Sequence, residues 1–169
     1  MKKIKQKKNI LLPLAAVLCL LSVAAMVIAL TRPAEPQTGA FIPPAFDAAA
    51  IEGVPTVPEE LAWLEVSQEG MSFSAHVCAE VIIENNSADL YFTSAAENEV
   101  WLKLRVLDSE GNILGETGLI KPGEYVQSVS FETQPKDGET IRLKLMSYEP
   151  ETYYSMGAVV LNTTVKMGG

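Results

Sequence analysis

Cysteine and histidine are scarce in this chain, which holds two cysteines and one histidine in 169 residues. Cys19 lies in a long apolar run and Cys78 lies far beyond it, so we expect no disulfide in the part that follows the run. These residues are also too few for a tetrahedral zinc site. Any catalytic triad or histidine-rich metal site would have to use His76. A domain in this part of the chain must therefore be held together by its hydrophobic core.

Positive charge is also scarce after residue 32. Residues 33–169 contain all 21 acidic residues and only seven basic ones, a formal net charge of −14, whereas five lysines stand among the first eight residues. The acidic balance argues against a general nucleic-acid binder. The contrast between the two ends indicates that they lie in different surroundings.

An uncharged stretch of 21 residues runs from Ile10 to Leu30. About 20 apolar residues of helix span a bilayer core, and the lysine-rich side of such a helix stays in the cytoplasm. The alternative is a signal peptide cleaved near Ala24, but the apolar run continues beyond that position and favours an uncleaved anchor. We therefore predict a single-pass protein of the cell membrane, with residues 1–9 in the cytoplasm, a transmembrane helix over 10–30 and an extracellular C-terminal domain.

Proline is concentrated in one segment, with six of the ten prolines between Pro33 and Pro58. Proline lacks a backbone donor and favours extended conformations, so we expect no packed helix or sheet there. The segment 31–60 is predicted to be an extracellular stalk, which is shorter if Phe41, Phe46 and Ile51 fold back. Residues 61–169 then form the extracellular domain.

Apolar and polar residues alternate from Met71 onward, which predicts strands with one buried face. The predicted strands cover residues 77–84, 90–93, 100–106, 113–116, 125–131, 141–145 and 159–165. Turn-forming residues separate them at 84–87, 108–112, 121–124 and 135–138. About seven short strands without a helical period predict an all-β fold, an antiparallel immunoglobulin-like β-sandwich. Trp63 and Leu64 are candidates for a leading strand.

Several short motifs in this domain carry a resemblance. They are Leu90-Tyr91-Phe92, Asn98, Leu107-Asp108 before a Gly111-Asn112 turn, and the run from Gly118 to Glu124. Over residues 70–166 the chain resembles a family of small membrane-anchored immunoglobulin-like proteins of Gram-positive bacteria, a family without an assigned activity. The resemblance implies the architecture and brings no catalytic residues; Thr93-Ser94 stands where the family often has a turn-forming Asn-Pro.

Two groups of residues have spacings that suggest a catalytic or a metal-binding site. Ser74, His76 and Cys78 alternate on one strand face, which places them side by side without making a nucleophile and base; a packed histidine and a core cysteine explain them better. Asp108, Glu110 and Asn112 have the spacing of calcium ligands, but Gly111 comes too early for a calcium loop and no closing glutamate follows. A hairpin turn explains the same residues. We predict no catalytic residues, cofactor or metal.

Basic residues and a tryptophan share the polar phase of two strands, 100–106 and 141–145. In an immunoglobulin-like order these strands would be neighbours, giving one basic face with Trp101, Lys103, Arg105, Arg142 and Lys144. An exposed tryptophan beside arginines has the composition of a binding hot spot. The alternative is that each base pairs with a cross-strand glutamate.

These observations favour a membrane-anchored extracellular binding module that is not an enzyme, and that serves as an accessory subunit of a cell-surface assembly. Its expected partners are the membrane and a protein or other envelope component. An envelope hydrolase and a scaffold that acts through its membrane helix are the alternatives.

Overall fold

The computed structural model describes residue 22 and residues 42–67 and 73–168, and it divides the chain into two compact units, 1–41 and 42–169. The predicted transmembrane helix over 10–30 lies outside the described residues, apart from Ser22. None of the helices within the described part is long and apolar enough to cross a membrane. The following description concerns the second unit.

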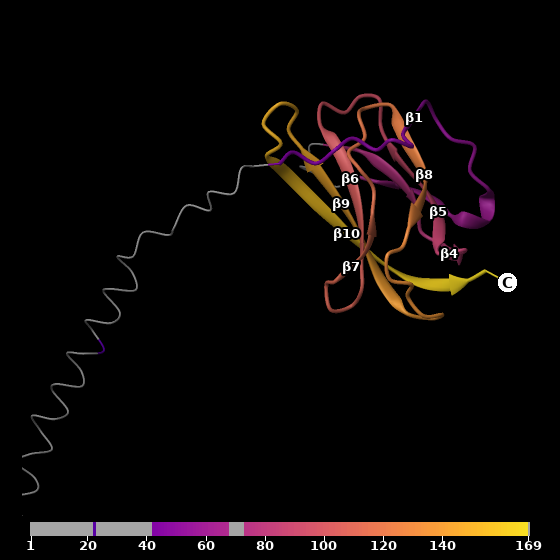
Figure 1. Ribbon diagram of the computed structural model, residues 1–169. Helices are drawn as coiled ribbons and strands as arrows, with labels where there is room; N and C mark the ends of the chain where they lie inside the picture. The colour runs from indigo at the N-terminus through magenta and orange to yellow at the C-terminus, as the bar shows by residue number, and fades with distance from the viewer. Residues whose placement is uncertain (1–21, 23–41, 68–72, 169) are drawn as a thin grey trace, which may run out of the picture. The chain divides into compact units, whose positions relative to one another are not determined.

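The second unit is all-β, as predicted, and residues 42–67 and 73–168 contain no α-helix. Its elements are β1 (Ile51–Glu52), the 3-10 helix η1 (Glu59–Leu61), β2 (Trp63–Val66), β3 (Ala75–Cys78), β4 (Val81–Glu84), β5 (Ser87–Ser94), β6 (Trp101–Leu107), β7 (Ile113–Glu116), β8 (Glu124–Ser130), β9 (Thr140–Tyr148) and β10 (Ser155–Met167). The strands form one curled sheet with the order β1-β8-β5-β4-β10-β9-β6-β7 (Figure 1). Two further strands lie off this path, β3 beside β5 and β2 beside β3. This order confirms the strands but not the immunoglobulin-like arrangement, which stays a prediction.

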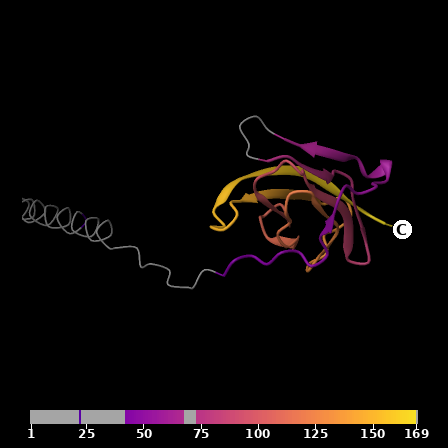
Figure 2. The same ribbon diagram turned by 90° about the horizontal axis from the view of Figure 1, so that it is seen from above.

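The 13-residue strand β10 joins the two layers of the curled sheet (Figure 2). Ser155 to Thr164 pair antiparallel with β9, whereas Val165 to Met167 pair parallel with β4. The prediction of a purely antiparallel sheet was therefore wrong for β10 and β4. Alternation along the sequence reports only which face a residue occupies, and it does not report the direction of the neighbouring strand.

The core lies between the two layers and consists of the inward phases of the strands. From β6 and β9, six apolar side chains with 0% exposure enter it: Leu102, Leu104, Val106, Ile141, Leu143 and Leu145. Phe92 and Ile83 of the opposite layer belong to the same buried cluster. Each such side chain contributes about 1.5–3 kcal/mol on burial. Cys78, the cysteine among the described residues, is free and buried, so apolar packing stabilises this unit without a disulfide.

The predicted strand 77–84 is divided into β3 and β4. The amide groups of Ala79 and Glu80 donate to the carbonyl oxygens of Ala62 and Leu61 at 3.1 and 3.2 Å, which removes them from the ladder. The predicted turn at 84–87 is confirmed. Asn85 and Asn86 both have positive φ, 48° and 67°, as a two-residue hairpin turn requires.

The segment 42–61 packs on the sheet, although we predicted a stalk without packed structure over 31–60. The amide of Asp47 donates to Leu119 O at 2.8 Å, the amide of Leu119 donates to Ala45 O at 2.9 Å, and β1 pairs with β8. A Cβ on Gly118 would lie 2.5 Å from the Asp47 nitrogen, so this close approach requires glycine. The prediction was wrong for this part because proline removes donors only at its own positions.

Candidate binding surface

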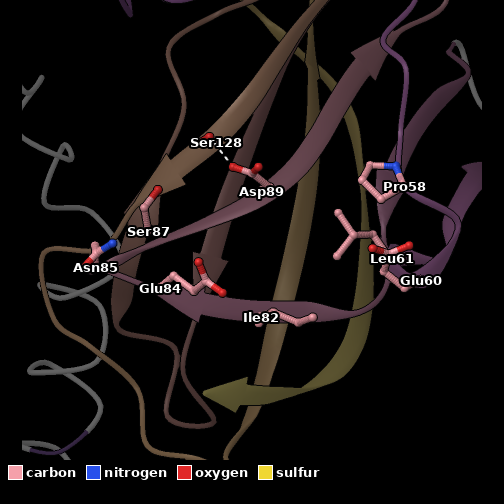
Figure 3. Close-up of a pocket in the computed structure, with 9 residues that line it drawn as sticks. All are labelled: Pro58, Glu60, Leu61, Ile82, Glu84, Asn85, Ser87, Asp89 and Ser128. Atoms are coloured by element: carbon pink, nitrogen blue, oxygen red, sulfur yellow. Dashed lines mark hydrogen bonds between the residues drawn. The ribbon is translucent and has the colours of Figure 1, made fainter. Parts of the chain in front are cut away.

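A depression of about 470 Å³ lies beside β4 and β5 (Figure 3). Glu60, Glu84 and Asp89 place three carboxyl groups around it. The Asp89 carboxylate accepts hydrogen bonds from Ser128 Oγ and from Gln127 Nε2. In the described ranges, no group of three or more His, Cys, Asp or Glu side chains is arranged to hold a metal ion. We assign no ligand to this depression.

Ser74, His76 and Cys78 are not arranged as a nucleophile and base. The His76 ring stacks on Trp63 with centroids 4.3 Å apart, and the Ser74 hydroxyl donates to Glu65 Oε1 at 3.1 Å. Burial, with the Asp89 charge adding to it, raises the pKa of the Cys78 thiol to about 12. Both stacked rings line a second depression of about 440 Å³. Because its pKa is raised, the Cys78 thiol keeps its proton, and the Ser74 hydroxyl is hydrogen-bonded to the Glu65 carboxylate rather than to His76.

The loop with Asp108 is a hairpin turn closed by its own carboxylate. Asp108 Oδ1 accepts the amide protons of Glu110, Gly111 and Asn112 at 2.7–2.8 Å, and Oδ2 accepts Asn112 Nδ2 at 2.7 Å. These hydrogen bonds, first that of the Asn112 side chain, lower the pKa of Asp108. Gly111 has φ of +100°. Both carboxylate oxygens serve the turn, which explains the spacing that resembled a calcium loop.

The register of β6 and β9 brings the five candidate residues onto one face of the sheet. Arg105 lies directly opposite Lys144, and the other three occupy the same phase of these strands: Trp101, Lys103 and Arg142. Residues opposite each other on neighbouring strands point to the same side, and here the core leucines point to the other side. We call these five residues the cationic face. Whether it contacts a partner stays a prediction.

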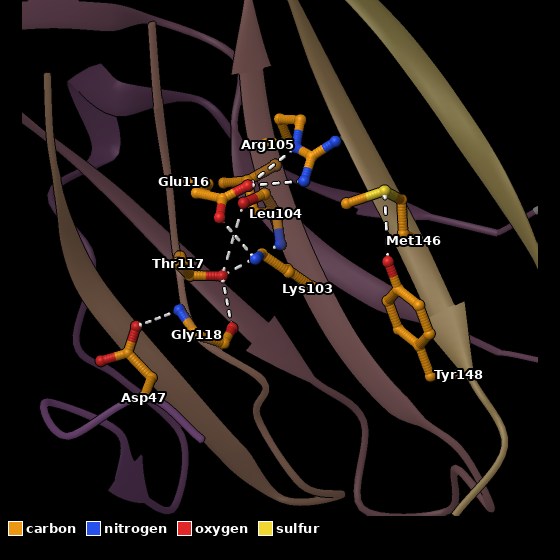
Figure 4. Close-up of polar contacts among 9 residues, drawn as sticks. All are labelled: Asp47, Lys103, Leu104, Arg105, Glu116, Thr117, Gly118, Met146 and Tyr148. Atoms are coloured by element: carbon orange, nitrogen blue, oxygen red, sulfur yellow. Dashed lines mark hydrogen bonds and ion pairs between the residues drawn. The ribbon is translucent and has the colours of Figure 1, made fainter. Parts of the chain in front are cut away.

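Glu116 of β7 neutralises part of the cationic face (Figure 4). Its two carboxylate oxygens accept Lys103 Nζ at 2.6 Å and Arg105 Nε at 2.8 Å. Burial alone would raise the pKa of Glu116, but the hydrogen bonds and charges of Lys103 and Arg105 outweigh burial and lower it. The alternative interpretation of the sequence, in which bases of this face pair with a cross-strand glutamate, therefore holds for Lys103 and Arg105.

Lys103 is buried, although its polar phase predicted exposure. The residue is 8% exposed, and its ammonium group contacts Glu116. A lysine this buried needs a partner charge, because an isolated buried ammonium is very costly. Lys103 therefore belongs to the support of the face and offers little surface to a partner.

Arg142 and Lys144 differ from the bases on β6. Arg142 donates from Nε and Nη2 to the carbonyl oxygen of Asp108, at 3.2 and 3.0 Å, and so holds the hairpin turn. Carbonyl oxygens leave the positive charge of a guanidinium uncompensated. Lys144 is half-buried and forms no ion pair or hydrogen bond with any of the described residues. These two residues keep the net positive charge of the face.

Trp101 is half-buried between two aromatic side chains. Its ring packs edge-on against Phe46, with centroids 4.8 Å apart, and lies 5.2 Å from Tyr153. The sequence analysis did not identify these neighbours or Glu116. The sequence did contain a sign of Glu116, because this residue ends a predicted alternating strand. It contained no sign of the contact between Phe46 and Trp101, because these residues are too far apart in the sequence for any pattern to link them.

Comparisons with known proteins place the chain in no family. No family model matches it, and no curated protein matches it. Among solved structures, it is similar to CopC from Methylosinus trichosporium OB3b, with 14% identity, a TM-score of 0.35, and coverage of 63% of this chain and 96% of that one. The resemblance to anchored proteins of Gram-positive bacteria therefore stays a prediction.

Proposed function

We propose that this chain is a membrane-anchored, non-enzymatic binding module, with its β-domain outside the cell and its cationic face turned to an acidic partner in a cell-surface assembly. An immunoglobulin-like sandwich is the scaffold that this proposal assumes. The observation that carries it is the uncompensated charge of Lys144 and Arg142.

The charge distribution supports an acidic partner. Residues 42–169 hold seven basic and 20 acidic residues, a formal net charge of −13, yet four of the seven bases lie on β6 and β9. Within β6, β7, β9 and β10, Glu116 is the one acidic residue. A local positive field on an acidic protein favours partners of opposite charge and chiefly accelerates their association.

The test is photo-crosslinking of the full-length protein in its native membranes, with a photoreactive residue at Asn162, next to Arg142 in the register. Lys144→Glu should reduce crosslinking to a partner several-fold, because it reverses the charge that no described residue compensates. Lys136→Glu makes the same change at an exposed loop position and is the control. Equal crosslinking by both variants would contradict the proposal.

A second experiment distinguishes contact through the β-domain from contact through the membrane segment. Exchange of residues 10–30 for an unrelated spanning helix should leave crosslinking unchanged if the domain makes the contact. Loss of crosslinking in that variant would favour a scaffold that acts through its membrane segment.

A further inference from the structure

The first ten residues of β10 form an open sheet edge. Ser155 to Thr164 pair with β9 on one side, and no strand in the described part of the chain pairs with them on the other side. The edge is solvent-accessible, with Met156 48% and Val160 46% exposed. On the inward phase, Val159 and Leu161 pack against the core but are only partly buried.

The backbone groups that face this edge follow from the register. The amide of Val165 donates to Glu139 O at 2.9 Å, so odd-numbered residues of β10 turn their backbone groups toward β9. The amide of Gly168 donates to Ile83 O at 2.9 Å on the β4 side, which places even-numbered residues on that side. Ala158, Val160 and Asn162 therefore present their N–H and C=O groups to the open edge.

This edge lacks the features that usually block pairing. Natural edge strands carry lysines, prolines or bulges along their length, or are short. From Ser155 to Val165 the strand has no charged residue and no proline, and its bulge lies at the start, between Ser155 and Gly157. An open edge of this kind is a template for one more strand.

We propose that the β10 edge binds an extended acidic segment of the partner by β-strand addition, a proposal that rests on the function proposed above. Val160 lies opposite Lys144, and Asn162 lies opposite Arg142. An added strand lies about 4.8 Å beyond β10 and so about 9.6 Å from β9, a distance that the side chain of Lys144 and a glutamate of the added strand cover together. Alternate carboxylates of that strand face Lys144 and Arg142, and the residues between them cover Val159 and Leu161.

Charge argues against a second copy of this chain as the occupant. Pairing of two β10 edges about a two-fold axis would place the Lys144 and Arg142 side chains of both copies on one continuous face. Two units of net charge −13 would also be brought together. Like charges on neighbouring strands are destabilising, so an acidic heterologous strand fits this edge better than the chain itself.

The test uses the full-length chain in nanodiscs of uncharged lipid and a capped heptapeptide, Thr-Glu-Val-Glu-Val-Glu-Thr. Amide hydrogen exchange is measured at Ala158, Val160 and Asn162. A saturating amount of peptide should slow exchange at these three amides about tenfold or more, because their N–H groups become hydrogen-bonded. The same peptide with lysine in place of glutamate should leave them unchanged.

Two variants test whether the slowed amide exchange comes from binding at the β10 edge. Val160→Glu places on the open edge, opposite Lys144, a charge of the same sign as the peptide and should abolish the protection, whereas Val54→Glu, at a residue 79% exposed elsewhere, should not. Thermal unfolding of both variants controls for the fold.

Three results would overturn the proposal. One is equal protection by the lysine peptide, and another is protection that appears without peptide as the protein concentration rises, which would make a second copy the occupant. The third is binding of the acidic peptide without protection of the three amides. In that case loss of binding in Lys144→Glu would leave the proposed binding module standing and remove only strand addition.

Discussion

The two halves of the cationic face lie on one sheet surface but differ in how their polar groups are satisfied. In the half formed by β6 and β7, Lys103 and Arg105 share the Glu116 carboxylate, and Trp101 lies under Phe46. In the half formed by β9 and β10, Lys144 has no partner among the described residues, and the strand edge is open and uncharged.

This difference separates a stabilising role from a binding role within one surface. Groups that are already paired and buried can give little to a partner, because any new contact must first break an existing one. Exposed apolar groups and uncompensated charges carry no such cost. We therefore expect substitutions of the paired residues in the β6–β7 half to lower stability, and substitutions of Lys144 or of the exposed residues of β10 to leave it nearly unchanged.

The largest effect should follow from removing the segment that covers the β6–β7 half. Replacement of residues 42–58 by a flexible Gly/Ser segment of equal length removes Phe46, the Asp47 contacts and β1. The loss of several hydrogen bonds, each worth about 1 kcal/mol, should lower the unfolding free energy by about 4 kcal/mol. Chemical denaturation measures it. An unchanged midpoint would mean that this segment does not pack on the sheet in solution.

Glu116→Ala should have the next largest effect. It leaves Lys103 buried without a partner charge, and we expect a loss of about 2 kcal/mol in unfolding free energy. Glu132→Ala, at an exposed position, is the control and should change little. Addition of Lys103→Met to the Glu116 variant should restore stability. Failure of that rescue would show that the carboxylate acts in another way.

Trp101→Ala tests the aromatic packing. The tryptophan is half-buried, so truncation should cost about 1–2 kcal/mol, less than in a closed core. Tyr154 is 72% exposed, and Tyr154→Ala should be nearly neutral. Thermal unfolding of the two variants measures the difference, and equal melting temperatures would place Trp101 outside the packed half.

The pH dependence tests the same carboxylate. Because the folded pKa of Glu116 is lowered, its stabilising effect is fully present above the ordinary pKa of about 4.5 and is lost as the pH falls through the lower folded pKa. The stability difference between the wild type and Glu116→Gln should therefore be constant from pH 5 to 7 and shrink in acid. Denaturation at a series of pH values measures it, and a difference independent of pH would exclude the ion pairs as its source.

The smallest effect on stability belongs to Lys144. Lys144→Ala removes a side chain with no partner among the described residues and should change the unfolding free energy by less than about 0.5 kcal/mol. Its effect should resemble that of Lys136→Ala in an exposed loop. A loss as large as that of Glu116→Ala would remove the distinction between the two halves.

Local patterns in the sequence determined the strands and their faces. Alternation predicted the all-β fold, and Asn85-Asn86 and Asp108–Asn112 predicted turns, because pleating and positive φ are properties of a few neighbouring residues. The same alternation placed Trp101, Lys103, Arg105, Arg142 and Lys144 on one face, since the phase of a residue fixes the side of the sheet it occupies.

Only the tertiary structure decided which of these residues are paired. Glu116 reaches Lys103 because β7 folds back beside β6, and Phe46 covers Trp101 because the segment after residue 42 returns to the sheet. The open edge of β10 likewise depends on where β4 stops pairing with it. Such contacts join residues that are distant in the sequence. The alternation of apolar and polar residues specifies the side of the sheet on which a residue lies, but it does not specify which distant residue folding brings beside it.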